Sequence, residues 1–398
     1  MMSLLTEEMR RDPFGLYRQI RSTSPVVHVP EGDLWMVFDY DRVKRVLQDD
    51  AAFRSDATES GRKNLDWLIF LDPPRHTKLR ALISRAFTPK SVASLEPRIR
   101  ELSRELLDAT VERGAMDLAA DYAIPLPLMV ISEMLGAPVA DRPLFRRWSD
   151  VILILSYSLT PGPEAERAVA AYREVTEEMR SYVARLIADR RAQPRDDLLT
   201  RLVHAEVDGD RLSEAEILGF FQLLLIAGHE TTTNLVDNAI LCFLESPGEL
   251  ARVRATPELL PSAIEEVLRY RSPVQWMFRS TREAVDLDGH AIPAGKLVLP
   301  VIGSANRDPL RFADPDRFDV ARDPNPHVAF GHGIHFCLGA PLSRLEAKVA
   351  LADLLERLHE LELASDDPWE PRKALHVHGP ARLPIRFAPA PPSTGRAG

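Results

Sequence analysis

The residues with the clearest chemical potential form a glycine-rich loop around a cysteine near the C-terminal end of the chain. The loop reads Phe330-Gly-His-Gly-Ile-His-Phe-Cys337-Leu-Gly339. Glycines at 331 and 333 allow a tight turn and let a flat ligand approach the backbone. Cys337 precedes a helix predicted over 340–359, and exposed N–H groups at a helix start can lower a thiol pKa from about 8.5 to roughly 3.5–7.5. The loop therefore suits an anionic sulfur ligand for a soft metal, whereas a buried structural cysteine is the alternative for a lone Cys.

A second group of polar residues interrupts a long apolar stretch in the middle of the chain. A capping box at Ser213–Glu216 opens a helix with no stop signal before Ser246-Pro247, which predicts one helix of about 33 residues. Its centre reads Ala227-Gly-His-Glu230-Thr231-Thr-Thr. A buried carboxylate and β-branched hydroxyl residues disfavour a helix, so a compensating use is plausible. Gly228 is expected to open a pocket, and a threonine can bond the carbonyl four residues back. The alternative is that the threonines back-bond and Glu230 is in a salt bridge.

Two further pairs have helical spacing. His76 and Arg80 are four residues apart, so they share one helix face and suit carboxylate groups, although a solvated charged face is the alternative. Glu266 and Arg269 are three apart and can pair on one face. Such a pair is most often an exposed one of small energetic value.

Taken together, these motifs resemble those of the cytochrome P-450 family, over roughly residues 12–387. The loop from Phe330 to Gly339 is similar to the family's haem-binding loop, and 227–231 to its oxygen-activating segment. His335 stands where many members carry Arg, and it can still meet a haem propionate. The resemblance implies a mainly α fold with a small β region. This would be a single-domain cytochrome P-450 fold over residues 1–388, with haem b between the long central helix and the cysteine loop. Residues 389–398 are rich in Pro, Ala, Ser and Gly, which predicts a disordered tail.

The resemblance also implies roles for individual residues. Cys337 would be the metal ligand, Glu230 would relay protons, and Thr231 would hydrogen-bond the oxygen substrate. Glu266 and Arg269 would form a buried structural network behind the haem. The residues expected to bind the cofactor are His76, Arg80, Ala227, Gly228, Arg279, Phe330, Gly331, His335, Cys337 and Gly339. The residues expected to line the substrate pocket are Trp67, Phe70, Leu224, Val274, Trp276, Met277 and Val377.

The activity implied is that of a haem-thiolate monooxygenase, since a thiolate trans to oxygen favours O–O cleavage. It would hydroxylate or epoxidise a bulky apolar molecule of bacterial secondary metabolism, such as a macrolide, terpenoid or steroid. Electrons would come from NAD(P)H through a separate ferredoxin and its reductase. An acidic ferredoxin is expected to dock on basic residues, which are Arg75, Lys78, Arg85, Arg344 and Lys348.

Three other functions are alternatives to this one. A peroxygenase of this kind usually lacks the Glu–Thr pair, and a haem-binding sensor would not need an oxygen-activating segment. A non-haem metal site using His332, His335 and Cys337 is conceivable from their spacing. Its geometry is poor, because the three residues lie in one short loop with no distant fourth ligand.

Composition limits the remaining possibilities. The 398 residues carry a net charge of −9 with dispersed basic residues, which disfavours nucleic-acid binding. Two cysteines fit a reducing compartment, and the chain has no run of about 18 apolar residues, so a cytoplasmic protein without a membrane span is expected. The elements expected to position the site are a helix over 13–22, a hairpin of strands 26–29 and 34–38, a helix over 41–49, an irregular stretch over 54–71, helices throughout 95–191 with a break at Pro125 and Pro127, a lid-like loop over 156–163 and a strand over 297–301.

Overall fold

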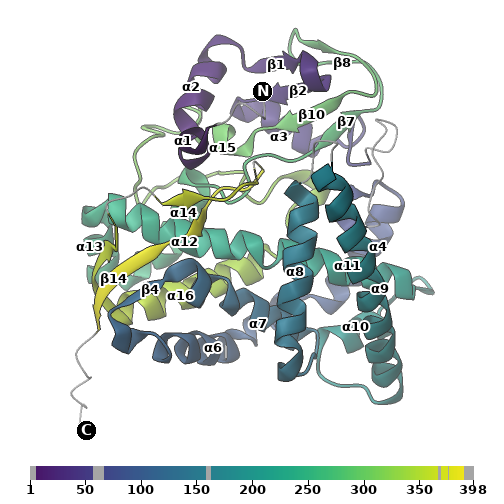
Figure 1. The fold of residues 1–398 in the computed structure, drawn as a ribbon. Coiled ribbons are helices and arrows are strands. Elements are labelled where there is room, and N and C mark those ends of the chain that lie inside the picture. Colours follow the sequence, from purple (N-terminus) through teal and green to yellow (C-terminus); the bar gives the residue numbers. More distant parts are fainter. Residues whose placement is uncertain (1–5, 57–66, 158–162, 366–368, 375, 390–398) are drawn as a thin grey trace.

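The computed structural model describes residues 6–56, 67–157, 163–365, 369–374 and 376–389. The described part is mostly helical, with small sheets, as expected (Figure 1). The helices are α1 (Glu7–Arg11), α2 (Phe14–Thr23), α3 (Tyr40–Gln48), α4 (Arg75–Ala86), α5 (Pro89–Ala93), α6 (Glu96–Asp108), α7 (Pro125–Met134), α8 (Arg142–Tyr157), α9 (Pro163–Ala192), α10 (Leu198–His204), α11 (Glu214–Ala227), α12 (Glu230–Glu245), α13 (Pro247–Ala255), α14 (Leu260–Tyr270), α15 (Ile302–Ala305) and α16 (Ala340–Arg357).

The strands join distant parts of the chain into short sheets. They are β1 (Val26–Val29), β2 (Leu34–Val37), β3 (Phe53–Arg54), β4 (Ala115–Asp117), β5 (Glu206–Val207), β6 (Asp210–Arg211), β7 (Arg279–Thr281), β8 (Val285–Asp286), β9 (Ala291–Ile292), β10 (Leu297–Pro300), β11 (Leu358–Leu363), β12 (Glu370–Pro371), β13 (Pro380–Arg382) and β14 (Pro384–Pro389). The largest sheet has the order β1-β2-β10-β7-β3. The predicted hairpin β1–β2 is confirmed, and β2 also pairs in parallel with β10, with Leu34 opposite Leu297.

The central helix is not continuous, so the prediction of a single helix from 213 to 246 is wrong. The capping box at Ser213 forms as expected and starts α11, which ends at Ala227. A second helix, α12, begins at Glu230 and ends at Glu245. The break coincides with the polar segment, where the Thr231 hydroxyl donates to the Ala227 carbonyl at 2.7 Å. A side chain that takes a carbonyl of the preceding turn competes with the helix's own hydrogen bonds, which explains the interruption.

Helices α12 and α16 both contribute many residues to the largest cluster of buried apolar side chains. Helix α16 packs against α6, α12 and α14 in the lower part of Figure 1, whereas β1, β2, β10 and β7 lie in its upper part with the N-terminal helices. Helices α8, α9 and α11 stand together on one side. In α12 every residue from Thr232 to Phe243 is buried, including several polar ones. Polar side chains in such a position need partners or a function.

One expectation about the region before α8 needs correction. Residues 95–191 are not helical throughout, because β4 lies within them and pairs with β14. Three residues are too short to show a strand period, and a distant strand supplies the pairing. The expected break at Pro125 and Pro127 is present: a π-helical segment ends at Ala123, and the two prolines stand in the first turn of α7, where a missing N–H is no loss.

Parts of other expectations fall outside the described residues. This holds for 57–66 of the irregular stretch, for 158–162 of the lid-like loop and for 390–398 of the predicted tail. Pro389, expected to begin that tail, is the last residue of β14 and pairs with Leu358. Within the part of the chain that the structure describes, no helix is long and apolar enough to cross a membrane.

Candidate active site

The cysteine loop has the backbone conformation that its glycines predict. Gly331 and Gly333 have φ of +74° and +73°, in the left-handed region that other residues rarely adopt. A Cβ on Gly333 would lie 2.9 Å from Gln48 Cα, so the loop packs directly on the backbone of α3. The Cys337 N–H donates to the Phe330 carbonyl at 2.9 Å and closes the loop. The side chain of Cys337 is exposed and belongs to no disulfide.

The ionisation of Cys337 differs from the expectation. Although its side chain is open on one side, the surrounding protein raises the pKa of the Cys337 thiol above its ordinary value by desolvation. The N–H groups of Gly339 and Ala340 and the charge of Arg80 lower this pKa, as a helix start should, but they are the smaller effects. A bound metal cation would supply what they lack, because a coordinating thiol is deprotonated outright. A Cβ at position 339 would fit beside the Cys337 sulfur, since it would lie 3.9 Å away, at ordinary contact distance.

Four nitrogen-bearing side chains gather beside this loop. His76 and Arg80 come from α4, Arg279 from β7 and His335 from the loop itself. The rings of His76 and His335 lie 4.2 Å apart, and Arg80 donates to the Phe336 carbonyl at 2.6 Å. His335 is further held by the Ser55 hydroxyl at 2.9 Å.

The electrostatics of this group are those of an anion site. Burial, reinforced by the charges of Arg279, His76 and Arg80, lowers the pKa of His335 to about 2. Burial also lowers the pKa of Arg279 to about 10. Among the described residues, no carboxylate forms an ion pair with any of the four. Both ring nitrogens of the buried His76 lack a hydrogen-bond partner within that same part of the chain. A ligand that brings carboxylates would satisfy these donors, so the residues fit the propionates of a haem.

The break between α11 and α12 exposes one line of the central helix. Leu224, Ala227 and Thr231 follow one another at helical spacing and are partly or fully exposed, as are Ile226 and Gly228 beside Ala227, whereas Leu223, Leu225, His229 and Glu230 are buried. Glu230, beside Thr231, is buried. The expectation that Gly228 opens a pocket is wrong, because a Cβ there would lie 2.8 Å from Ile131 Cδ1. Gly228 therefore allows α7 to pack closely against the break.

The expected pocket residues fall into separate groups. Trp67 and Phe70 stack with ring centroids 6.0 Å apart, next to the helix that carries Leu224. Val274 and Val377 form a β-bridge, and Met277 packs with Val274 on the same apolar cluster. The structure places Trp276 in a different cluster, with Leu34, Leu299 and Phe278, and so gives its proposed pocket role no support.

Glu266 and Arg269 form the buried network that was expected. Both side chains are fully buried, and the guanidinium contacts the carboxylate through two bonds of 2.7 and 2.8 Å. Arg269 also donates to the carbonyls of Asn306, Pro315 and Arg317. This pair therefore fixes the long segment that leads to the cysteine loop.

Removal of the Arg269 side chain should strongly lower the stability of the protein. Arg269→Ala is expected to lower the free energy of unfolding by about 3–5 kcal/mol. It leaves the fully buried Glu266 with Arg322 as its remaining guanidinium partner, and it removes the donor to the carbonyls of Asn306, Pro315 and Arg317. Arg269→Lys should restore little, since an ammonium group cannot reproduce the guanidinium's contacts. Thermal or urea unfolding measures both. Arg252→Ala, which removes an exposed pair with Glu249, should hardly move Tm. An equal Tm for Arg269→Ala and the wild type would contradict this role.

Several polar residues of the site were missed in the sequence. His229 is buried in the helix break and contacts the Ser149 hydroxyl at 3.1 Å; burial lowers its pKa to about 3, so the ring is neutral. Burial raises the pKa of Glu346 in α16 to about 8. Gln222 is a buried amide within α11. The available signal was the same for all three, namely a polar residue on an otherwise apolar helix face.

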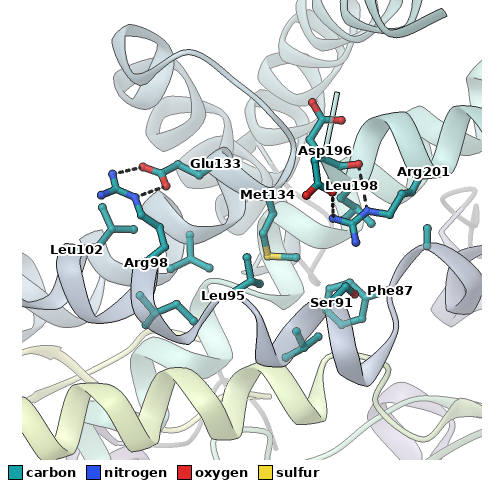
Figure 2. Close-up of a pocket in the computed structure, with 15 residues that line it drawn as sticks. Phe87, Ser91, Leu95, Arg98, Leu102, Glu133, Met134, Asp196, Leu198 and Arg201 are labelled. Atoms are coloured by element: carbon teal, nitrogen blue, oxygen red, sulfur yellow. Dashed lines mark hydrogen bonds and ion pairs between the residues drawn. The ribbon is translucent and has the colours of Figure 1, made fainter. Parts of the chain in front are cut away.

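A separate cavity lies away from the cysteine loop. It has a volume of about 160 Å³ and lies between α4, α5, α6, α7 and α10 (Figure 2). None of the expected site residues lines it, and the ion pairs Arg98–Glu133 and Arg201–Asp196 stand at its edges. In the described residues, no three His, Cys, Asp or Glu side chains are arranged to hold a metal ion. The alternative of a non-haem site at His332, His335 and Cys337 therefore has no structural support.

Several known proteins are similar to this chain in sequence and in fold. The family model for Cytochrome P450 matches residues 144–381. The chain is 42% identical to the putative cytochrome P450 YjiB of Bacillus subtilis, over 92% of this chain and 93% of YjiB. It is also 42% identical to the cytochrome P450 monooxygenase PikC of Streptomyces venezuelae, over 97% of this chain and 94% of PikC. Among solved structures it resembles CYP109E1 of Bacillus megaterium in complex with testosterone, with a TM-score of 0.87 and 42% identity over 94% of this chain and 99% of that one. The chain belongs to the cytochrome P450 family, and is a haem b monooxygenase that takes electrons from a redox partner.

Proposed function

We propose that Cys337 is the thiolate ligand of the haem iron and that this chain oxidises a bulky apolar small molecule. One observation carries the assignment of the ligand. The open sulfur of Cys337 lies in the same loop as His335, beside His76, Arg80 and Arg279, which have no carboxylate partner among the described residues. When bound there, haem supplies the reductive activation of dioxygen.

The chain's own residues would then act on either side of the cofactor. His76, Arg80, Arg279 and His335 would hold its carboxylates and orient it. At the break between α11 and α12, the Thr231 hydroxyl would rotate so that it donates to the oxygen substrate in place of the Ala227 carbonyl. Glu230 would replace the proton that Thr231 gives up. Leu224 and Ala227 present an apolar line that favours a lipophilic substrate. We further propose that residues 1–388 act as one domain, since a single core cluster contains residues from Trp67 to Phe387.

The substrate class rests on both the residues and the relatives. Trp67, Phe70, Val274 and Val377 are apolar, and CYP109E1, which is 42% identical, has been crystallised with testosterone. A steroid, terpenoid or macrolide of bacterial secondary metabolism has the matching size and polarity. The two cysteines, Cys242 and Cys337, are both free, which is consistent with a cytoplasmic location.

Two measurements test this function. The reduced protein under carbon monoxide should show the red-shifted Soret band of thiolate ligation. With a ferredoxin, its reductase and NAD(P)H, testosterone as a probe should be converted to a product that carries one ¹⁸O atom from ¹⁸O₂. Steady NAD(P)H consumption would exclude a haem-binding sensor. A normal Soret band without any substrate-dependent consumption across a panel of steroids, terpenoids and macrolides would overturn the proposal.

We also propose that the electrons come from an acidic ferredoxin, although the dock differs from the expected one. Lys78 pairs with Asp210 at 2.8 Å, and Arg85 donates to the Glu206 carbonyl, so hairpin β5–β6 partly neutralises α4. Arg344 is held by Glu265 through bonds of 2.7 and 2.8 Å. Lys348 is exposed on α16, and no carboxylate of a described residue forms an ion pair with it. It is therefore the most available of the five basic residues.

Charge reversal at Lys348 tests this dock. Lys348→Glu should reduce the second-order rate of reduction by ferredoxin roughly tenfold at low salt, because steering by opposite charges is lost. The difference should shrink as salt rises and screens the charges. Stopped-flow reduction under carbon monoxide measures these rates. Lys373→Glu, the same charge change after β12, is the control. Equal rates for both variants at low salt would contradict the dock.

A further inference from the structure

Gln222 occupies an unusual place in α11. It is 4% exposed and follows Phe220 and Phe221 in an apolar stretch of the helix. No step of the proposed chemistry uses it. A buried amide is costly unless each of its groups is hydrogen-bonded, so its partners are informative.

The partners of Gln222 determine the orientation of its amide. Trp67 Nε1 lies 3.2 Å from the oxygen Oε1, and an indole nitrogen can only donate. The Tyr172 hydroxyl donates to the same oxygen at 3.2 Å. The nitrogen Nε2 donates to Thr176 Oγ1 at 3.2 Å. The oxygen is thus used twice and the nitrogen once.

These bonds join three separate parts of the molecule. Trp67 precedes the short helical turn Leu68–Phe70. The Phe70 ring stacks almost parallel to the Trp67 ring, with an angle of 14° between the ring planes. Tyr172 and Thr176 are four residues apart on α9 and share a face. A single side chain therefore ties the aromatic pair and α9 to the helix that carries Leu224 and Ala227.

We infer that Gln222 is a positioning residue of the substrate pocket: it fixes the Trp67–Phe70 wall and α9 against the central helix and so sets how long a bulky ligand remains bound. The inference rests on the proposed function, because that function makes Trp67 and Phe70 part of the pocket. Loss of the amide would leave the buried Trp67 N–H without the acceptor that it has in Gln222 Oε1. An unpaired buried N–H favours a loosened wall in which water reaches it.

The first arm of the test observes the hydrogen bond itself. The ¹H–¹⁵N indole resonances are recorded in the ferrous carbon monoxide form, and Trp67→Phe identifies the Trp67 signal. In Gln222→Met, which keeps the length of the side chain, this signal should move upfield, and its exchange with solvent should rise about tenfold. Thr233→Val is the matched control, because it removes another buried bond of the central helix, from Thr233 to the Ala123 carbonyl. It should lower Tm without affecting the Trp67 signal.

The second arm measures ligand retention with two azoles that bind haem iron. Clotrimazole is bulky and should dissociate about tenfold faster from Gln222→Met than from the wild type, whereas imidazole is too small to reach the wall and should dissociate equally fast. The double variant with Trp67→Phe should resemble Gln222→Met alone if both act through the same bond.

The outcomes separate this inference from the proposed function. An unchanged Trp67 signal in Gln222→Met, or a changed signal with an unchanged clotrimazole rate, would overturn the inference. A rise shared by imidazole and by Thr233→Val would also overturn it, since it would indicate general destabilisation. Absence of any azole spectrum would refute the haem site of the proposed function. The indole signal, recorded then on the protein without haem or carbon monoxide, would still decide whether Gln222 fixes Trp67.

Discussion

Alanine in place of Cys337 is expected to remove the red-shifted carbon monoxide band and to abolish oxygen insertion. The sulfur is the only part of the loop that this change removes. The Cys337 N–H would still bond the Phe330 carbonyl, and Gly331 and Gly333 would keep their left-handed conformations. The fold should therefore persist, and the haem-free forms of the variant and of the wild type should have similar Tm values. Absorption spectra, haem content and product analysis measure the three effects.

Cys242 provides a matched control for this experiment. It is buried in α12 at 1% exposure, and burial raises the pKa of its thiol to about 12, so it remains protonated. Cys242→Ala should lower stability by leaving a small cavity, with a normal carbon monoxide band. The opposite pattern, in which Cys337→Ala keeps the band or Cys242→Ala loses it, would show that the ligand has been misassigned.

Thr231→Ala is expected to divert reducing equivalents into hydrogen peroxide while folding, haem content and substrate binding remain normal. The reason lies in the position of its hydroxyl, which is partly exposed at the helix break and bonds the Ala227 carbonyl. Without it, a proton would no longer be placed beside the oxygen substrate. The product formed per NAD(P)H should fall roughly tenfold, within the range of general acid–base effects. Glu230→Gln should slow turnover by about 10²-fold through proton supply.

The two neighbouring threonines are controls, because their hydroxyls face elsewhere. Thr232 Oγ1 lies 3.3 Å from the Ser343 hydroxyl on α16, and Thr233 Oγ1 donates to the Ala123 carbonyl at 2.9 Å. Their alanine variants should be less stable, but they should form as much product per NAD(P)H consumed as the wild type. Peroxide, product and NAD(P)H consumption are measured together. An equal yield of product per NAD(P)H in all three threonine variants would show that the segment serves only helix packing.

Local patterns predicted those parts of the site that depend on short sequence spacing. The left-handed glycines, the capping box at Ser213 and the pair Glu266–Arg269 all follow from residues a few positions apart. The fold class and the family were recognised in the same way and are confirmed. The alignment of His76 with His335 was implied only by the resemblance, because nothing in the local sequence brings α4 to the loop.

What the sequence could not provide arises from tertiary packing. Gly228 was interpreted as an opening, but the space beside it is filled by Ile131 of α7. The thiol pKa of Cys337 was expected to fall, yet desolvation by the rest of the protein outweighs the local N–H groups. Trp276 was expected at the pocket from its character alone, and only the strands around it determine that it packs with Leu34 and Leu299. In each case the deciding atoms belong to residues far away in the chain.

The pairing of β2 with β10 has a consequence for how the chain folds during synthesis. The N-terminal hairpin leaves the ribosome early, but its parallel partner, with Leu297 opposite Leu34, follows only after most of the chain. Until then the edge of β2 presents unpaired N–H and C=O groups that invite association with other chains. Arg279 lies on β7, which pairs with β10, so one of the residues expected to hold the haem is positioned only when this late strand arrives. Haem added during expression would bind only chains in which this sheet is complete, and would thereby shift the folding equilibrium toward such chains. The yield of intact protein should therefore depend on chaperones and on haem supply during translation.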